Sequence, residues 1–244
     1  MTAVTETQES RHVLVTGGDR GIGRAIAERF LQAGYKVTCA DLGGEPPEGA
    51  FGVSCNVTDA EQVDAAFKAA EAENGPVGVL VANAGITKDT LILRMGDAEW
   101  DAVIDVNLKA LFFTCQAFAK ETLACGRKAR IVNIASLLSF QGGIRVPSYT
   151  AAKHGVAGLT KLMANEWAAT GINVNAIAPG YIETNNTEAL RNDPERNRAI
   201  LDRIPAGRWG HPEDIAGAAV FLCSPAAAYV HGAVLNVDGG WLAR

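Results

Sequence analysis

Short apolar runs alternate with longer stretches of helical periodicity along most of the chain. Seven runs rich in β-branched and small apolar residues predict strands at about residues 12–16, 36–40, 51–55, 77–82, 130–135, 173–178 and 233–237. Between the first two runs, apolar positions such as Ile22, Ile26 and Phe30 recur at helical spacing. Helices are predicted at about residues 21–33, 59–74, 97–121, 148–170 and 212–223, with a polar, mobile helical excursion at 185–203.

Strands that alternate with helices indicate parallel pairing through right-handed crossovers. The predicted fold class is therefore α/β, a single-domain doubly wound parallel sheet of seven strands flanked by helices. We find no internal repeat and no linker, so residues 11–244 form one predicted domain, and the polar residues 1–10 are predicted to be a disordered tail. Ligands of such sheets bind beyond the carboxyl ends of the strands, so the loops after strands are the ones to examine.

Composition narrows the class of protein. The chain has 244 residues, of which 48% are hydrophobic, and this excludes a disordered or collagen-like protein. The net charge of −5 argues against nucleic acid or an anionic membrane as partner. The sequence contains no run of 18 apolar residues, so no membrane helix is predicted. The four histidines lack metal-ligand spacing, so no metal site is predicted. Scattered cysteines predict reduced thiols and a cytoplasmic protein. They are Cys39, Cys55, Cys115, Cys125 and Cys223.

A glycine-rich turn follows the first predicted strand and opens the first predicted helix. Its glycines allow the backbone to turn tightly and to approach a pyrophosphate at the positive end of the helix. The spacing is Gly-x-x-x-Gly-x-Gly, and a glycine turn without a ligand is the alternative. The residues of this turn that we predict to bind a dinucleotide are Gly17, Asp19, Arg20, Gly21, Ile22 and Gly23.

Asp41 follows the second predicted strand, 18 residues after Gly23. A carboxylate at this place accepts hydrogen bonds from the adenosine ribose hydroxyls and repels a 2′-phosphate, which favours NAD. Arg20 favours NADP because a guanidinium pairs with phosphate, although Asp19 beside it weakens that argument. We therefore predict NAD and leave NADP open, with an ordinary loop aspartate as the alternative for Asp41.

Two further turns after strands contain candidate coenzyme contacts. Asn56 and Val57 follow the third strand and are predicted to flank the adenine. Asn83, Ala84 and Gly85 follow the fourth strand, where small residues let a ribose lie against the backbone. Each turn read alone is equally compatible with an ordinary loop.

Tyr149 and Lys153 are four residues apart on a predicted helix and share one face. A neighbouring ammonium favours the phenolate and is expected to lower the pKa of the tyrosine, which then exchanges a proton with a carbonyl or hydroxyl oxygen. Ser136 lies just past a strand, where its hydroxyl can hold the same oxygen. Asn107 is predicted to hold a water that links Lys153 to solvent. The alternatives are a chance Tyr/Lys pair and a helix amide bonded to the backbone.

These motifs together resemble the short-chain dehydrogenase/reductase family over residues 11–244. The matching motifs are residues 16–23, Asn83-Ala84-Gly85, Asn107, Ser136, Tyr149 with Lys153, and Pro179-Gly180. The resemblance implies a Rossmann-type fold, a nicotinamide cofactor, hydride exchange at a carbonyl or secondary alcohol, and a homotetramer. It also implies a catalytic tetrad and a nicotinamide-side loop. The tetrad comprises Asn107, Ser136, Tyr149 and Lys153, and the loop residues are Pro179, Gly180, Ile182 and Thr184.

Subfamily signals differ between the two halves. Residues 11–113 resemble bacterial 3-oxoacyl-acyl-carrier-protein reductases, on residues 44–49 and 84–89. Residues 131–244 resemble 2-deoxy-D-gluconate dehydrogenases, on residues 139–149, 184–187, 204–210 and 237–244. A natural intermediate and a recombinant or designed chimera both remain open. Asn56 departs from the aspartate that is common beside adenine in the family.

The loops after Ser136 and Pro179 are expected to line the substrate pocket, and both lie in the half that resembles the sugar-acid enzymes. Arg145 is predicted to pair with a substrate carboxylate, while Gln141 and Asn186 bond hydroxyls. The predicted substrate is thus a small keto or hydroxy sugar acid, held also by Ser136 and Tyr149. The alternatives are a 3-oxoacyl-acyl-carrier-protein reductase and a catalytically silent nucleotide-binding regulator.

Overall fold

The computed structural model describes residues 10–244 and contains one sheet of seven parallel strands, in the order β3-β2-β1-β4-β5-β6-β7. The α/β class and the seven predicted strands are confirmed, with each strand end within two residues of its predicted place. The strands are β1 (His12–Thr16), β2 (Lys36–Asp41), β3 (Phe51–Ser54), β4 (Val79–Ala82), β5 (Ala129–Ile134), β6 (Ile172–Pro179) and β7 (Val234–Val237). Most of the predicted tail lies outside the described residues. Its last residue, Ser10, donates a hydrogen bond to the carbonyl oxygen of Pro76.

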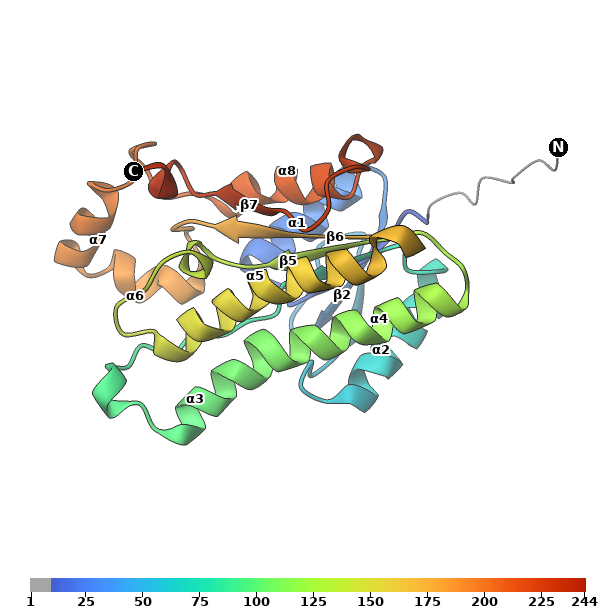
Figure 1. Cartoon of the computed structure of the whole chain (residues 1–244), viewed down its shortest axis with the longest axis horizontal. Helices are drawn as coiled ribbons and strands as arrows, with labels where there is room; N and C mark the ends of the chain where they lie inside the picture. Colours follow the sequence, from blue (N-terminus) through green and yellow to red (C-terminus); the bar gives the residue numbers. More distant parts are fainter. Residues whose placement is uncertain (1–9) are drawn as a thin grey trace.

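Helices cover both faces of the sheet, as Figure 1 shows. One face carries α1 (Gly21–Gln32) and α8 (Pro212–Leu222), and the other carries α2 (Ala60–Asn74), α4 (Leu111–Ala124) and α5 (Pro147–Trp167). Alternate strand residues enter the two cores. Val13 and Val15 pack toward α1 and α8, whereas Leu14 between them packs toward the other layer. Because both faces are covered, the strands appear in sequence as continuous apolar runs.

The predicted helix at 97–121 is interrupted in the structure. It consists of α3 (Asp97–Ile104), a π-helical turn η2 (Asp105–Ala110) and α4. The whole stretch Asp97–Ala124 is long and apolar enough, by length and composition alone, to span a membrane. Within its most apolar segment of 18 residues, 44% is buried inside the protein. The stretch is not an uninterrupted run of 18 apolar residues, so the sequence pattern does not predict it as a membrane helix. In this structure its buried side chains, such as Phe118, pack against the sheet and α2.

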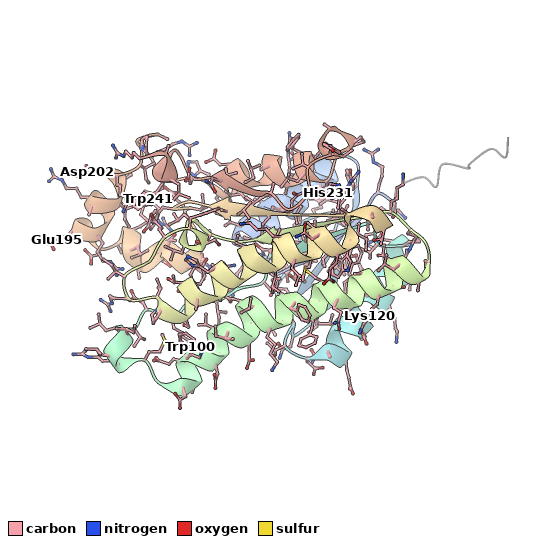
Figure 2. All side chains as sticks on the ribbon, viewed as in Figure 1. Trp100, Lys120, Glu195, Asp202, His231 and Trp241 are labelled. Carbon is pink, nitrogen blue, oxygen red and sulfur yellow. The ribbon has the colours of Figure 1, made fainter. Side chains whose placement is uncertain are left out.

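Short helical segments cross the carboxyl edge of the sheet, where Figure 1 places α6 and α7 at the end opposite the N-terminus. They are η3 (Leu137–Ser139), η5 (Asn185–Thr187), α6 (Glu188–Arg191) and α7 (Pro194–Leu201). A small apolar cluster fixes them, and Figure 2 shows Trp241 of this cluster at the same end as Asp202, beside α7. Arg203 lies 4.1 Å above the Trp241 ring, so the C-terminal residues hold the excursion predicted at 185–203 against the edge of the sheet.

The remaining short segments are 3-10 turns that connect the larger elements. They are η1 (Ile92–Arg94), η4 (Ala168–Thr170), η6 (Pro225–Ala227) and η7 (Trp241–Ala243). Two helix starts follow simple local rules. Asp59 caps α2 by accepting hydrogen bonds from the backbone N–H groups of Glu61 and Gln62, and Pro147 occupies the first turn of α5, where its missing N–H costs nothing.

Candidate active site

The glycine turn between β1 and α1 forms a tight backbone cradle. Gly17 has a φ of 66° and Gly21 a φ of 55°, in the left-handed region that other residues rarely adopt. A Cβ atom at Gly23 would lie 2.0 Å from the carbonyl oxygen of Gly17, so only glycine fits there. Small residues at the start of α1 leave its N-terminus open to an anion. The cradle therefore fits the pyrophosphate of a dinucleotide.

Thr16, at the end of β1, and Asn83, just after the neighbouring strand β4, hold this cradle. The Nδ2 of Asn83 donates to the carbonyl oxygens of Thr16, at 3.0 Å, and Gly17, at 2.9 Å. In return, the Thr16 hydroxyl accepts from the backbone N–H groups of Asn83, at 3.0 Å, and Ala84, at 3.1 Å. The side-chain amide of Asn83 thus bonds the glycine turn. Asn83 therefore supports a ligand site by fixing the conformation of the cradle.

One cleft along the carboxyl edge brings together most of the predicted coenzyme residues. Those that line it are Gly17, Arg20, Gly21, Ile22, Gly23, Asp41, Asn56, Val57, Asn83, Ala84, Gly85, Tyr149, Lys153 and Thr184. Sequence reasoning missed Leu42, Ile86 and Val106, which also line the cleft and carry no polar signal. Four predicted residues lie outside the lining: Asp19, Pro179, Gly180 and Ile182.

Ile182 and Gly180 are packed into the protein instead. Ile182 is buried in the α1/α8 core and pairs with Gly210 as an isolated bridge. Gly180 lies against Asp238, because a Cβ atom at Gly180 would be 2.6 Å from the Asp238 Cα. Their close packing positions the chain that leads to Thr184, and a direct coenzyme contact for either residue stays a prediction.

Lys153 is buried, with 4% of its surface exposed, and lies one helical turn after Tyr149 on α5. Its Nζ donates to the carbonyl oxygen of Ile134 at 2.6 Å and lies 5.5 Å from the centre of the Tyr149 ring. Burial lowers the pKa of Lys153 to about 8. This carbonyl bond and the packing fix the ammonium beneath the cleft.

The expected lowering of the Tyr149 pKa is wrong. Burial raises the pKa of Tyr149, and a hydrogen bond with Ser136 opposes that rise in part. The physical reason is that a phenolate loses hydration at this buried position. Tyr149 and Ser136 do lie together, as the sequence predicted, in an arrangement suited to proton donation.

Asn107 lies in the π-helical turn and is completely buried. Its Oδ1 accepts from the backbone N–H of Ile86, and its Nδ2 donates to the carbonyl oxygen of Ile86, both at 2.8 Å. The side chain therefore bonds backbone, but in the loop after β4 rather than in its own helix. It fixes the cleft wall at Gly85 and Ile86, and a role in holding water stays a prediction.

The predicted substrate residues separate into two groups. Asn186 lines the cleft, whereas Gln141 and Arg145 lie outside its lining. The guanidinium of Arg145 pairs with Asp89 at 2.6 Å, and the other oxygen of Asp89 pairs with Arg196 of α7 at 3.1 Å. Sequence reasoning missed Asp89 and Arg196 because their contact joins segments far apart in the chain. Gln141 accepts a hydrogen bond from Arg203 in the same region, at 3.3 Å.

Comparisons with known proteins show which proteins this chain is similar to. A family model described as enoyl-(acyl carrier protein) reductase matches residues 17–242. The chain is 48% identical to the 2-dehydro-3-deoxy-D-gluconate 5-dehydrogenase of Escherichia coli K12, over 97% of each protein. It is 43% identical to the 3-oxoacyl-[acyl-carrier-protein] reductase of Vibrio harveyi, over 95% of this chain and 97% of that protein. Similarity to the sugar-acid enzyme thus includes the N-terminal half.

Two solved structures share the fold closely. One is described as a 2-deoxy-D-gluconate 3-dehydrogenase from Agrobacterium tumefaciens with bound NADP; it is 61% identical, with a TM-score of 0.90 over 97% of this chain and 98% of that chain. The other is a gluconate 5-dehydrogenase from Burkholderia cenocepacia in complex with NADP and tartrate. It is 35% identical, with a TM-score of 0.91 over 97% and 96% of the two chains.

Proposed function

Since the chain belongs to the short-chain dehydrogenase/reductase family and is an oxidoreductase that uses NAD(P), we propose that its substrate is a small keto or hydroxy sugar acid. The observation that carries the proposal is the cleft itself, in which the glycine cradle, Tyr149 and Lys153 face one space. The choice of substrate is supported by the relatives, because two that are named as sugar-acid dehydrogenases reach 48% and 61% identity, against 43% for the carrier-protein reductase.

Tyr149, Ser136 and Lys153 have different roles in the proposed reaction. A bound nicotinamide supplies or accepts the hydride. The Tyr149 hydroxyl donates a proton to the ketone oxygen in reduction and accepts one from the alcohol in oxidation. Ser136 bonds the same oxygen and holds it beside Tyr149, and the Lys153 ammonium stabilises negative charge at the phenol. Because burial raises the pKa of Tyr149, the phenolate needed for oxidation forms more readily at alkaline pH.

The preferred coenzyme is proposed to be NAD, with NADP also accepted. Asp41 supports NAD, because it lines the cleft at the end of β2, where its carboxylate can accept bonds from ribose hydroxyls. The Agrobacterium and Burkholderia structures hold NADP, and Arg20 of this chain lines the same part of the cleft. A guanidinium there offers a 2′-phosphate one favourable contact.

A panel of substrates followed at the nicotinamide absorbance band, with both coenzymes, tests this proposal. The panel contains 2-dehydro-3-deoxy-D-gluconate, 2-deoxy-D-gluconate, D-gluconate and an acetoacetyl thioester. We expect the highest kcat/KM on a sugar acid. Turnover of the thioester with none of the sugar acids would favour the alternative, a 3-oxoacyl-acyl-carrier-protein reductase, to which the chain is 43% identical.

The assembly proposed for the enzyme is a homotetramer in the cytoplasm. Large apolar side chains stay exposed on the helical layer formed by α3, α4 and α5, among them Trp100, Phe113 and Leu162. Figure 2 labels Trp100, which belongs to α3. Exposed apolar patches of this kind mark protein contacts, and a second copy of the same layer is a matching partner. The cytoplasm is supported by the free thiols, of which only Cys125 is exposed.

A further inference from the structure

Two aspartates lie one behind the other at the ribose end of the cleft. Asp41 lines the cleft, and Asp19 lies behind it in the glycine turn. The backbone N–H of Asp19 donates to Oδ2 of Asp41 at 3.2 Å, and the N–H of Leu42 donates to Oδ1 at 2.8 Å. Each carboxylate oxygen of Asp41 therefore accepts one backbone hydrogen bond.

The Asp19 carboxylate lacks such support. Its Oδ1 is buried without a hydrogen-bond partner among residues 10–244, and its Oδ2 faces Gly44, where a Cβ atom would lie 2.8 Å away. A buried charged oxygen without a partner is unfavourable, so this environment favours the protonated form of Asp19. Burial and the neighbouring charge of Asp41 both raise the pKa of Asp19. From β2, the Cys39 thiol faces the pair and stays neutral, because burial raises its pKa to about 12.

Two arginines of this region face the aspartates, but neither is bonded to the Asp19 carboxylate. Arg24 of α1 lowers the pKa of Asp19 by its charge, yet its Nε pairs with Glu28 at 2.9 Å. Its Nη1 donates to the backbone carbonyls of Asp19, at 3.3 Å, and Glu45, at 2.9 Å. Arg20 is exposed on the cleft wall. The cations thus offset the negative charge in part, and within residues 10–244 neither donates a hydrogen bond to the Asp19 carboxylate.

We propose that Asp19 and Asp41 together make the choice between NAD and NADP depend on pH: with both carboxylates charged the site favours NAD, and a proton on Asp19 admits NADP. The inference rests on the proposed function, because it places the adenosine ribose against Asp41. A 2′-phosphate brings close to two negative charges at neutral pH. Charge on Asp19 adds to the repulsion from Asp41, and its protonation removes that part. Binding of NADP is therefore linked to uptake of a proton by Asp19, which acts behind Asp41 as a positioning residue.

The test measures binding of NAD⁺ and NADP⁺ by titration calorimetry from about pH 4.5 to about pH 8.5, at constant ionic strength. Asp19→Asn keeps the shape of the side chain and removes its charge. At about pH 8 we expect the Kd ratio of NADP⁺ to NAD⁺ to be about tenfold lower in the variant than in the wild type, with the two ratios converging at acid pH. The phosphate itself titrates near pH 6 in both proteins, so it cancels in the comparison.

Glu45→Gln is the matched control, since it removes one charge from the exposed loop beside the pair without touching either aspartate. Its Kd ratio should follow the wild-type pH profile. A second readout counts the protons taken up on binding, by titrations in two buffers of different ionisation enthalpy. The excess uptake with NADP⁺ over NAD⁺ should be larger in wild type than in Asp19→Asn, because titration of the phosphate itself is common to both proteins. An equal excess in the two proteins over the whole pH range, or an Asp19→Asn profile of Kd ratios parallel to wild type, would overturn the inference while leaving the proposed function standing. Wild type that binds neither coenzyme would overturn both.

Discussion

The buried lysine of the active site makes the stability of the protein depend on pH in a direction that can be predicted. Burial lowers the pKa of Lys153 from 10.5 to about 8. Between these two values the unfolded chain binds more protons than the folded chain, so the free energy of unfolding rises with pH. The difference of about 2.5 pKa units, at about 1.4 kcal/mol each, corresponds to a destabilisation of about 3 kcal/mol at neutral pH. Most of it disappears by about pH 10.

Lys153→Met tests this reasoning, because it removes the charge and keeps a chain of similar length. Urea unfolding at a fixed protein concentration gives the free energy of unfolding at about pH 7 and about pH 10. Wild type should gain about 2–3 kcal/mol more than the variant over this interval. Loss of the 2.6 Å bond to the Ile134 carbonyl shifts the variant by a similar amount at every pH, so the slope rather than the absolute stability is compared.

Lys120→Met is the control, since Lys120 is exposed on α4, as Figure 2 shows, and its removal should leave the slope of wild type unchanged. Parallel curves for wild type and Lys153→Met would refute the reasoning. They would mean that Lys153 has the same proton affinity in the folded and the unfolded chain, and that its burial does not penalise the ammonium.

Three further predictions concern the cradle, the substrate side and the assembly. Gly23→Ala should weaken coenzyme binding at least about tenfold, because its Cβ atom would lie 2.0 Å from a backbone oxygen; Gly217→Ala, with open space around its Cβ position within residues 10–244, should bind as wild type in the same calorimetric titration. Asp89→Asn should lower the KM for a sugar acid a few-fold by releasing Arg145, and Arg145→Leu should raise it; unchanged KM in both variants would remove Arg145 from the substrate site. If the proposed tetramer forms through this layer, Phe113→Asp should shift sedimentation velocity to smaller species, and a wild-type profile would place the interface elsewhere.

Strand positions and the location of the cleft could be predicted from the sequence because each depends on local pattern. A sheet covered on both faces needs apolar runs, and the loops after parallel strands meet at one edge. The order of strands and loops therefore predicts a shared site for Asp41, Asn56 and Gly85, and these residues line one cleft. Asp59 at the start of α2 follows from capping alone.

Features that depend on contacts between distant segments could not be predicted. Asn107 lies in the π-helical turn, and its side-chain amide bonds the backbone of Ile86 in the loop after β4. Hydrophobic periodicity in the sequence does not reveal such a pairing. The ion pairs of Asp89 with Arg145 and Arg196 join three segments in the same way. The direction of the Tyr149 pKa shift also depends on how deeply the phenol is buried, and sequence spacing reveals only the neighbouring charge.

We propose that the Tyr149 hydroxyl transfers the proton, in a site that binds the coenzyme independently of it. Tyr149→Phe removes one oxygen atom and keeps the ring, so the most direct measurement compares its kcat on the best sugar acid with its Kd for the coenzyme. We predict a fall in kcat of at least about a hundredfold with a Kd within about twofold of wild type. A variant that retains wild-type turnover would contradict the account.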